Sequence, residues 1–157
     1  MKKIMFLILA AMLLCTFVSC ENNTSDKGKQ GALVVEGQTI AKHTTIYPEY
    51  ATLPLCDVIS ALGFDLSPDG KDRAYFLCND VKYEICISEK TLTREGSNEN
   101  YLICAPGSSH YVCDIANGDL VVDSNTLHSL FYTFLNYPID ITIDGKNSCV
   151  TVKVRSQ

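Results

Sequence analysis

Two short helix patterns, set among segments that alternate like strands, constrain this chain more than any other feature of its sequence. Within residues 55–62 the apolar side chains fall at positions i, i+3, i+4 and i+7, with Pro54 in the first turn and Gly63 after them as a stop. Residues 127–134 repeat this apolar spacing 72 residues later. Helices this short must bury their single apolar face against strands, which indicates the α+β class.

Strand patterns occupy the segments on either side of the first helix pattern. Residues 38–52 are β-branched and aromatic but contain an internal proline, which predicts one or two short edge strands. The dipeptide Asn79-Asp80 separates two alternating segments, residues 73–78 and 81–87. A two-residue break of this kind predicts a β-hairpin.

The second half of the chain repeats the order of the first. The turn sequence of residues 144–147 repeats the Asp-Gly-Lys pattern of residues 69–72 at an offset of 75, and a strand pattern follows at 148–154. Together with the two helix patterns, this predicts a duplicated module of short, mostly antiparallel strands with one helix per repeat. The two repeats would span about residues 31–96 and 97–157.

The first residues are typical of an export signal. Lys2 and Lys3 precede an almost wholly apolar stretch, residues 4–18, and Ser19-Cys20 closes it. An apolar segment this short with a cationic start indicates a secretory signal peptide rather than a membrane span. Because it ends on cysteine, it resembles a bacterial lipoprotein signal, which implies removal of residues 1–19 and attachment of a fatty acyl group such as palmitate to Cys20. Plain secretion is the alternative.

The charge of the exported chain limits its partners. Removal of the signal takes Lys2 and Lys3 from the 13 basic residues and none of the 18 acidic ones, so the net charge falls from −5 to −7. A field of that sign repels nucleic acid and anionic head groups, so we expect no nucleic-acid partner and membrane contact through the lipid alone. Beyond the lipidated Cys20, residues up to 30 are polar or glycine and predict a flexible linker.

Six further cysteines follow Cys20 in the chain. An even number in an exported protein favours disulfides, whose pairing the sequence leaves open, while a reducing environment would leave them as small buried apolar side chains. The disulfide or thiol candidates are Cys56, Cys78, Cys86, Cys104, Cys113 and Cys149. The compact group Cys104, His110 and Cys113 has the spacing of a metal site, but we favour a loop joined by Cys104 and Cys113, or free thiols.

At the first helix pattern the chain resembles the copper amine oxidase N-terminal-like domain. The segments Leu53-Pro54-Leu55 and Ala61-Leu62-Gly63 match the helix entry and exit of that family, although Cys56 replaces an arginine and Ser60 a glutamate. The second copy departs further, with Phe131 at the position of the glycine. The resemblance covers residues 31–157 and implies an α+β module used as a stalk or surface-attached domain on bacterial envelope proteins, without copper or catalysis.

No catalytic pattern accompanies this resemblance. The three histidines, His43, His110 and His128, are widely separated in the sequence. The quinone-forming motif of amine oxidases is Asn-Tyr followed by an acidic residue. It is absent because leucine follows Asn100-Tyr101 and proline follows Asn136-Tyr137. We therefore expect no enzyme activity, no metal and no cofactor. Four tyrosines, which packing also explains, could form a surface for sugar stacking: Tyr47, Tyr50, Tyr111 and Tyr137.

The functional expectation is a non-catalytic envelope protein, anchored to the cell membrane by lipid and facing the periplasm or the cell exterior. It would act as a stalk or as a binding module for a protein or cell-wall partner. One alternative is a thiol-redox or metal-handling lipoprotein that uses Cys104, His110 and Cys113. Another is a small interaction domain whose contact segment is a long loop over residues 97–119.

Overall fold

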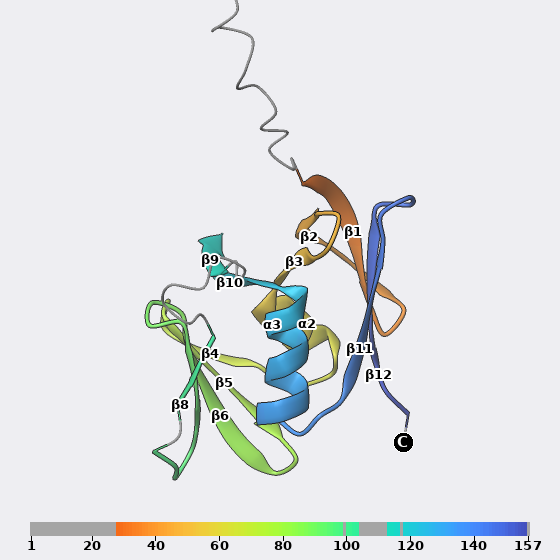
Figure 1. The fold of residues 1–157 in the computed structure, drawn as a ribbon. Coiled ribbons are helices and arrows are strands. Elements are labelled where there is room, and N and C mark those ends of the chain that lie inside the picture. The colour runs from red at the N-terminus through yellow and green to blue at the C-terminus, as the bar shows by residue number, and fades with distance from the viewer. Residues whose placement is uncertain (1–27, 99, 104–112, 117, 157) are drawn as a thin grey trace, which may run out of the picture.

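A computed structural model describes residues 28–98, 100–103, 113–116 and 118–156, which fold into two sheets and two α-helices (Figure 1). In the seven-stranded sheet the order is β11 (Ile139–Asp144), β12 (Cys149–Val154), β1 (Lys29–Val35), β2 (Gln38–Ile46), β3 (Ala51–Pro54), β10 (Asp119–Asp123) and β9 (Cys113–Ala116). In the five-stranded sheet it is β4 (Ser67–Asp69), β5 (Arg73–Cys78), β6 (Val81–Cys86), β7 (Thr91–Arg94) and β8 (Asn100–Leu102).

The strands are mostly antiparallel, as predicted. Every neighbouring pair in both sheets runs antiparallel except β1 and β12, which run parallel with Ala32 opposite Cys149 and Val35 opposite Val152. The helices are α2 (Leu55–Ala61) and α3 (Ser124–Ser129), and the π-helical turn η1 (Leu130–Phe134) continues α3. The α+β class predicted from the sequence is therefore confirmed.

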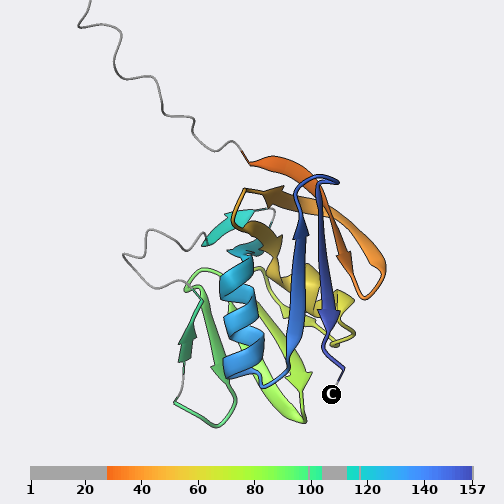
Figure 2. The same ribbon diagram turned by 45° about the vertical axis from the view of Figure 1, so that its right-hand side comes forward.

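The helices occupy the middle of the molecule. Figures 1 and 2 both show α3 between the five-stranded sheet and the β11–β12 hairpin. Fully buried side chains from all these layers form one hydrophobic cluster, with Leu33 and Val150 from the seven-stranded sheet, Ile85 from the five-stranded sheet, and Val58 and Leu127 from the helices. The two halves of the chain therefore share a single core.

Helix α2 forms where the apolar spacing predicts it. Leu55, Val58 and Ile59 are wholly buried on one face. Pro54 is the last residue of β3 and occupies the N-cap position, one place before the first-turn position predicted for it, and its side chain makes no capping hydrogen bond. The helix ends before Gly63, whose φ of +90° is the left-handed conformation that glycine adopts at low cost.

The second helix begins three residues earlier than its apolar pattern predicts. The buried Asp123 caps it, because its Oδ1 accepts hydrogen bonds from the backbone N–H groups of Asn125 and Thr126, both at 2.9 Å. Its Oδ2 accepts a third from the Thr126 hydroxyl at 2.6 Å. These polar residues give no apolar signal, so the periodicity misses the first turn of α3.

Several predicted strands and turns are confirmed, and two expectations are wrong. The hairpin of β5 and β6 turns at Asn79 and Asp80, whose φ angles of 51° and 61° suit the tight hairpin turn. Residues 38–52 were expected at a sheet edge, but β2 and β3 lie inside the seven-stranded sheet, with the proline in the turn between them. The expected long loop over residues 97–119 is interrupted by β8, β9 and the first residue of β10.

Candidate functional site

A hollow on the outer face of the β11–β12 hairpin is the first element of the candidate site. It has a volume of about 240 Å³ and is lined by Asp140, Thr142, Thr151 and Lys153. The hairpin register places Asp140 opposite Lys153 and Thr142 opposite Thr151. Since side chains alternate across a strand, these four side chains share one face while their isoleucine and valine neighbours pack toward the core.

Arg155 fixes the carboxylate at one end of this hollow. Its Nε donates to Asp140 Oδ1 at 3.0 Å, and its terminal nitrogen donates to the same oxygen, so the pair is bridged twice. The hydrogen bond from Arg155 lowers the pKa of Asp140 below its ordinary value, and the nearby His128 adds to the effect. Both partners of the ion pair are about half exposed. The carboxylate of Asp140 therefore stays ionised at the surface, and the charge of Arg155 balances it.

Lys153 is the second cation of the hollow. The described part of the chain holds no carboxylate within ion-pair distance of its ammonium group. The carboxylate of Asp140, the cross-strand neighbour of Lys153, already forms an ion pair with Arg155. Three ammonium N–H donors therefore remain available beside the two threonine hydroxyls.

An exposed aromatic ring lies next to the ion pair. The rings of His128 and Tyr132 stack with centroids 5.8 Å apart and an interplanar angle of 8°. Tyr132 is 56% exposed, although it lies within η1, whose neighbouring residues Leu130 and Phe131 are buried. Hydrogen bonding to Asp140 is the main cause of the raised pKa of Arg155, and Tyr132 contributes to it, which places the phenol near the guanidinium.

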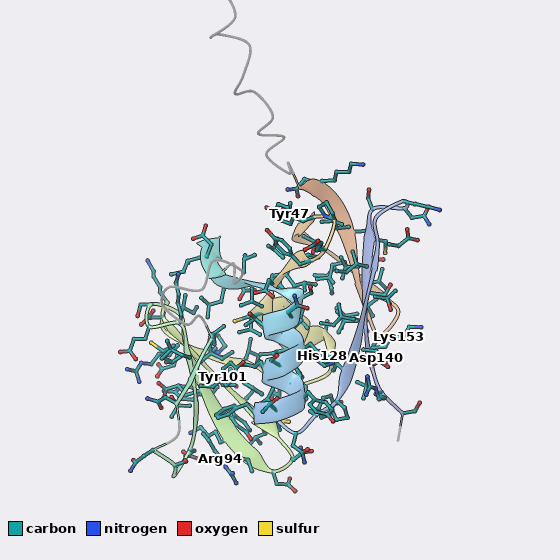
Figure 3. The ribbon with its side chains drawn as sticks, in the orientation of Figure 1. Tyr47, Arg94, Tyr101, His128, Asp140 and Lys153 are labelled. Atoms are coloured by element: carbon teal, nitrogen blue, oxygen red, sulfur yellow. The ribbon has the colours of Figure 1, made fainter. Side chains whose placement is uncertain are left out.

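The π-helical turn explains how Tyr132 comes to face outward. The backbone N–H of Leu135 donates to the carbonyl of Leu130, five residues earlier, at 3.0 Å. This wider turn brings Leu130, Phe131 and Leu135 to the buried side. Tyr132 is left exposed, stacked on His128 and near Arg155. Figure 3 shows His128, Asp140 and Lys153 on one side of the molecule.

We call the surface formed by His128, Tyr132, Asp140, Lys153 and Arg155, together with the two threonines, the hairpin surface. It combines an exposed ring, a neutralised ion pair, an ammonium donor and paired hydroxyls. No motif in the sequence marks this surface. The only local signal was the polar alternation of residues 139–154, and the strand register and the π-turn were needed to bring the groups together.

The outer face of the five-stranded sheet differs from the hairpin surface. Its charged side chains pair with one another, with Arg73 to Glu84 at 2.7 Å and Lys82 to Glu95 at 3.1 Å. Lys82 also lies 4.9 Å from the ring centroid of Tyr75. Such mutual pairing is typical of the solvated face of an antiparallel sheet.

The tyrosines proposed for sugar stacking lie elsewhere. Tyr47 and Tyr50 stack on one another across the β2–β3 turn, with centroids 4.5 Å apart. Tyr137 packs edge-on against Phe64 at 4.9 Å in the aromatic part of the core. Tyr111 lies outside the described residues. None of the three described tyrosines lines the hollow.

The four described cysteines carry free thiols. They are Cys56, Cys78, Cys86 and Cys149. Burial raises the pKa of Cys78 to about 11. Burial, with the nearby charge of Asp119 as the next cause, raises that of Cys56 well above its ordinary value. Both groups are therefore protonated thiols near neutral pH, the less nucleophilic form.

The remaining sequence candidates fall largely outside the described residues. Cys20, Cys104 and His110 lie there entirely, and of Cys113 only the backbone of β9 is described. Within the described part of the chain no group of three or more His, Cys, Asp or Glu residues is placed to hold a metal ion. Helices long and apolar enough to cross a membrane are likewise absent from that part.

A second cluster of polar groups joins two turns of the five-stranded sheet. The Asp72 carboxylate accepts hydrogen bonds from the Ser88 backbone N–H at 2.8 Å and from the Ser88 hydroxyl at 2.7 Å. The thiol of Cys86 donates to the same carboxylate at 3.5 Å. These bonds lower the pKa of Asp72 and hold the turn after β6 against the turn before β5. Their role in the fold is structural.

Comparison with models of known protein families, with curated proteins and with solved structures found no match to this chain.

Proposed function

We propose that this protein is a non-catalytic, lipid-anchored envelope protein whose hairpin surface binds a cell-wall or protein partner outside the membrane. The observation that carries the binding role is the hollow of Asp140, Thr142, Thr151 and Lys153. Arg155, which binds Asp140, also lies near the exposed ring of Tyr132. The anchoring role rests on the signal-like segment that ends at Cys20.

The position of the hairpin surface supports this arrangement. The described chain enters the fold at the start of β1, near Lys29. Because β1 and β12 run parallel, Lys153 lies just beyond the pair of Val35 and Val152, at the opposite end of β1. The seven residues of β1 place its two ends about 20 Å apart. A tether attached at residue 28 would therefore direct the hairpin surface away from its attachment point.

We also propose that the fold arose from two copies of one module, as the resemblance to the copper amine oxidase N-terminal-like domain implies. β3 runs directly into α2, and β10 runs directly into α3. β3 and β10 pair antiparallel within the seven-stranded sheet, with Leu53 opposite Val122. Each helix is followed by an antiparallel hairpin, β4–β5 or β11–β12, with an Asp-Gly-Lys turn.

Anchoring is tested by metabolic labelling of the full chain expressed in a bacterium. Labelled palmitate should enter the wild-type protein, and the protein should sediment with membranes. Cys20→Ala should remove both properties, whereas Cys149→Ala, which leaves the signal untouched, should remove neither. Absence of label from the wild-type chain would contradict the anchor and leave plain secretion.

Binding is tested with residues 21–157, which retain every residue of the hydrophobic core, from Leu33 to Val152. This soluble form should sediment with purified cell wall or with protein-containing membranes. Because the lipid is absent, sedimentation can come only from the folded surface. A protein that stays in solution with every fraction would refute the binding role.

A further inference from the structure

The charges of the hairpin surface exclude most classes of ligand. The exported chain carries a net charge of −7 once residues 1–19 are removed, which opposes the approach of polyanions. A cationic ligand would need an unpaired carboxylate, but Asp140 already accepts two hydrogen bonds from Arg155. An uncharged ligand meets neither obstacle, and its hydroxyl and carbonyl oxygens can accept from the ammonium group of Lys153.

The polarity of the hollow excludes an apolar ligand. Covering the hydroxyls of Thr142 and Thr151 and the ammonium group of Lys153 with apolar atoms would leave these groups without hydrogen bonds, which is unfavourable. A ligand with many hydroxyl groups can satisfy all three. It can also accept from, or donate to, the exposed edges of the Asp140–Arg155 pair.

Tyr132 adds a feature that selects among polar ligands. Its ring is 56% exposed, and one face is already supported by stacking on His128. A ring held in this way loses little freedom when a flat ligand covers it. The C–H groups on one face of a pyranose ring supply such an apolar patch, while the hydroxyls at the rim of the sugar remain free for the hollow.

We infer that the hairpin surface binds an uncharged glycan, with one sugar ring stacked on Tyr132 and the next hydrogen-bonded in the hollow by Thr142, Thr151 and Lys153. This inference rests on the proposed function and names the ligand class of the same surface. The paired hydroxyls lie across adjacent strands, whose spacing of about 4.8 Å is close to the length of one sugar unit.

The test is calorimetric titration of residues 21–157 with three defined probes. The neutral probe is a hexamer of β-1,4-linked N-acetylglucosamine, the acidic probe is a galacturonate hexamer, and the third is a six-residue glutamate peptide. The neutral hexamer should bind and the other two should not. Binding of either acidic probe in preference to the neutral one would overturn the inference.

Variants locate the binding on the hairpin surface. Tyr132→Ala should raise the dissociation constant about fivefold, the value of one aromatic contact. The double variant Thr142→Val and Thr151→Val, which keeps the β-branched shape, should raise it about tenfold or more. The matched control Thr93→Val, on the outer face of the five-stranded sheet, should leave it unchanged.

The outcomes separate the ligand class from the proposed function. If the wild-type domain sediments with wall or membranes but binds the neutral hexamer no better than the variants do, the glycan inference is wrong and the binding role stands. If the domain sediments with no fraction and binds no probe, both are wrong.

Discussion

Asp119 offers the sharpest test of how the two halves of the fold depend on each other. Its Oδ1 accepts from the backbone N–H of Cys56 at 2.9 Å, and its Oδ2 accepts from that of Asp57 at 3.2 Å. Pro54, the residue at the N-cap position of α2, makes no capping bond of its own. A carboxylate 62 positions away in the chain therefore caps the helix of the first half.

The magnitude follows from these contacts. A hydrogen bond to a charged group contributes about 1.5–3 kcal/mol, and an N-cap about 0.5–2 kcal/mol. Asp119→Ala removes two such bonds from a half-buried position, so we expect a loss of about 3 kcal/mol in the free energy of unfolding. For a domain of this size that corresponds to about 10 °C in Tm. Asp119→Asn keeps one acceptor oxygen and should lose about half as much.

The assay is urea and thermal unfolding of residues 21–157, followed by circular dichroism. The control is Asp114→Ala on the neighbouring strand, whose exposed carboxylate accepts only from the next backbone N–H in the described structure. It should change stability by less than about 0.5 kcal/mol. A loss just as small for Asp119→Ala would refute the capping role. Asp119→Ala should also make Cys56 more reactive toward alkylation, because the carboxylate charge of Asp119 helps raise the pKa of Cys56.

Three further predictions concern single positions. The pKa of Cys78 is raised from 9.0 to about 11, so the folded state keeps a proton that the unfolded state loses. The free energy of unfolding should therefore fall between about pH 9 and 11, and Cys78→Ala should flatten this slope in urea titrations; an unchanged slope would contradict the assignment. Arg155→Ala should raise the pKa of Asp140 toward its ordinary value in an NMR carboxyl titration. Because Arg155 lowers that pKa, its stabilising effect is lost as the pH falls through the acidic range, and an unaltered titration curve would count against the ion pair. Gly63→Ala should cost about 1 kcal/mol in urea unfolding, because φ is +90° and no atom crowds the added methyl group; a neutral result would show that the turn relaxes.

Local signals predicted the parts of the fold whose geometry is decided locally. The apolar face of α2, the glycine that ends it and the Asn79-Asp80 turn each depend on neighbouring residues only. The first turn of α3 was missed because Asp123 and Thr126 satisfy each other by hydrogen bonds and not by apolar burial. The interior position of β2 and β3 was missed because strand order depends on pairings between distant segments.

The candidate site could not be predicted from the sequence, because it too depends on pairings between segments that are not adjacent in the chain. Asp140 and Lys153 face each other through the hairpin register, which a one-residue shift would change entirely. Tyr132 falls within the predicted second helix, and only the π-turn sets it beside Arg155. The sequence instead directed attention to Tyr47 and Tyr137, which the fold uses for packing.

Binding at the hairpin surface requires a partner to touch the domain there, and NMR mapping of residues 21–157 measures this directly. Backbone amide shifts would be followed during titration with soluble glycan fragments released from purified cell wall. We expect shifts concentrated in α3 and η1, in β11 and in β12, centred on Tyr132 and Thr151. Shifts confined to the outer face of the five-stranded sheet or to the Tyr47–Tyr50 turn, or no shifts at all, would contradict glycan binding at the hairpin surface.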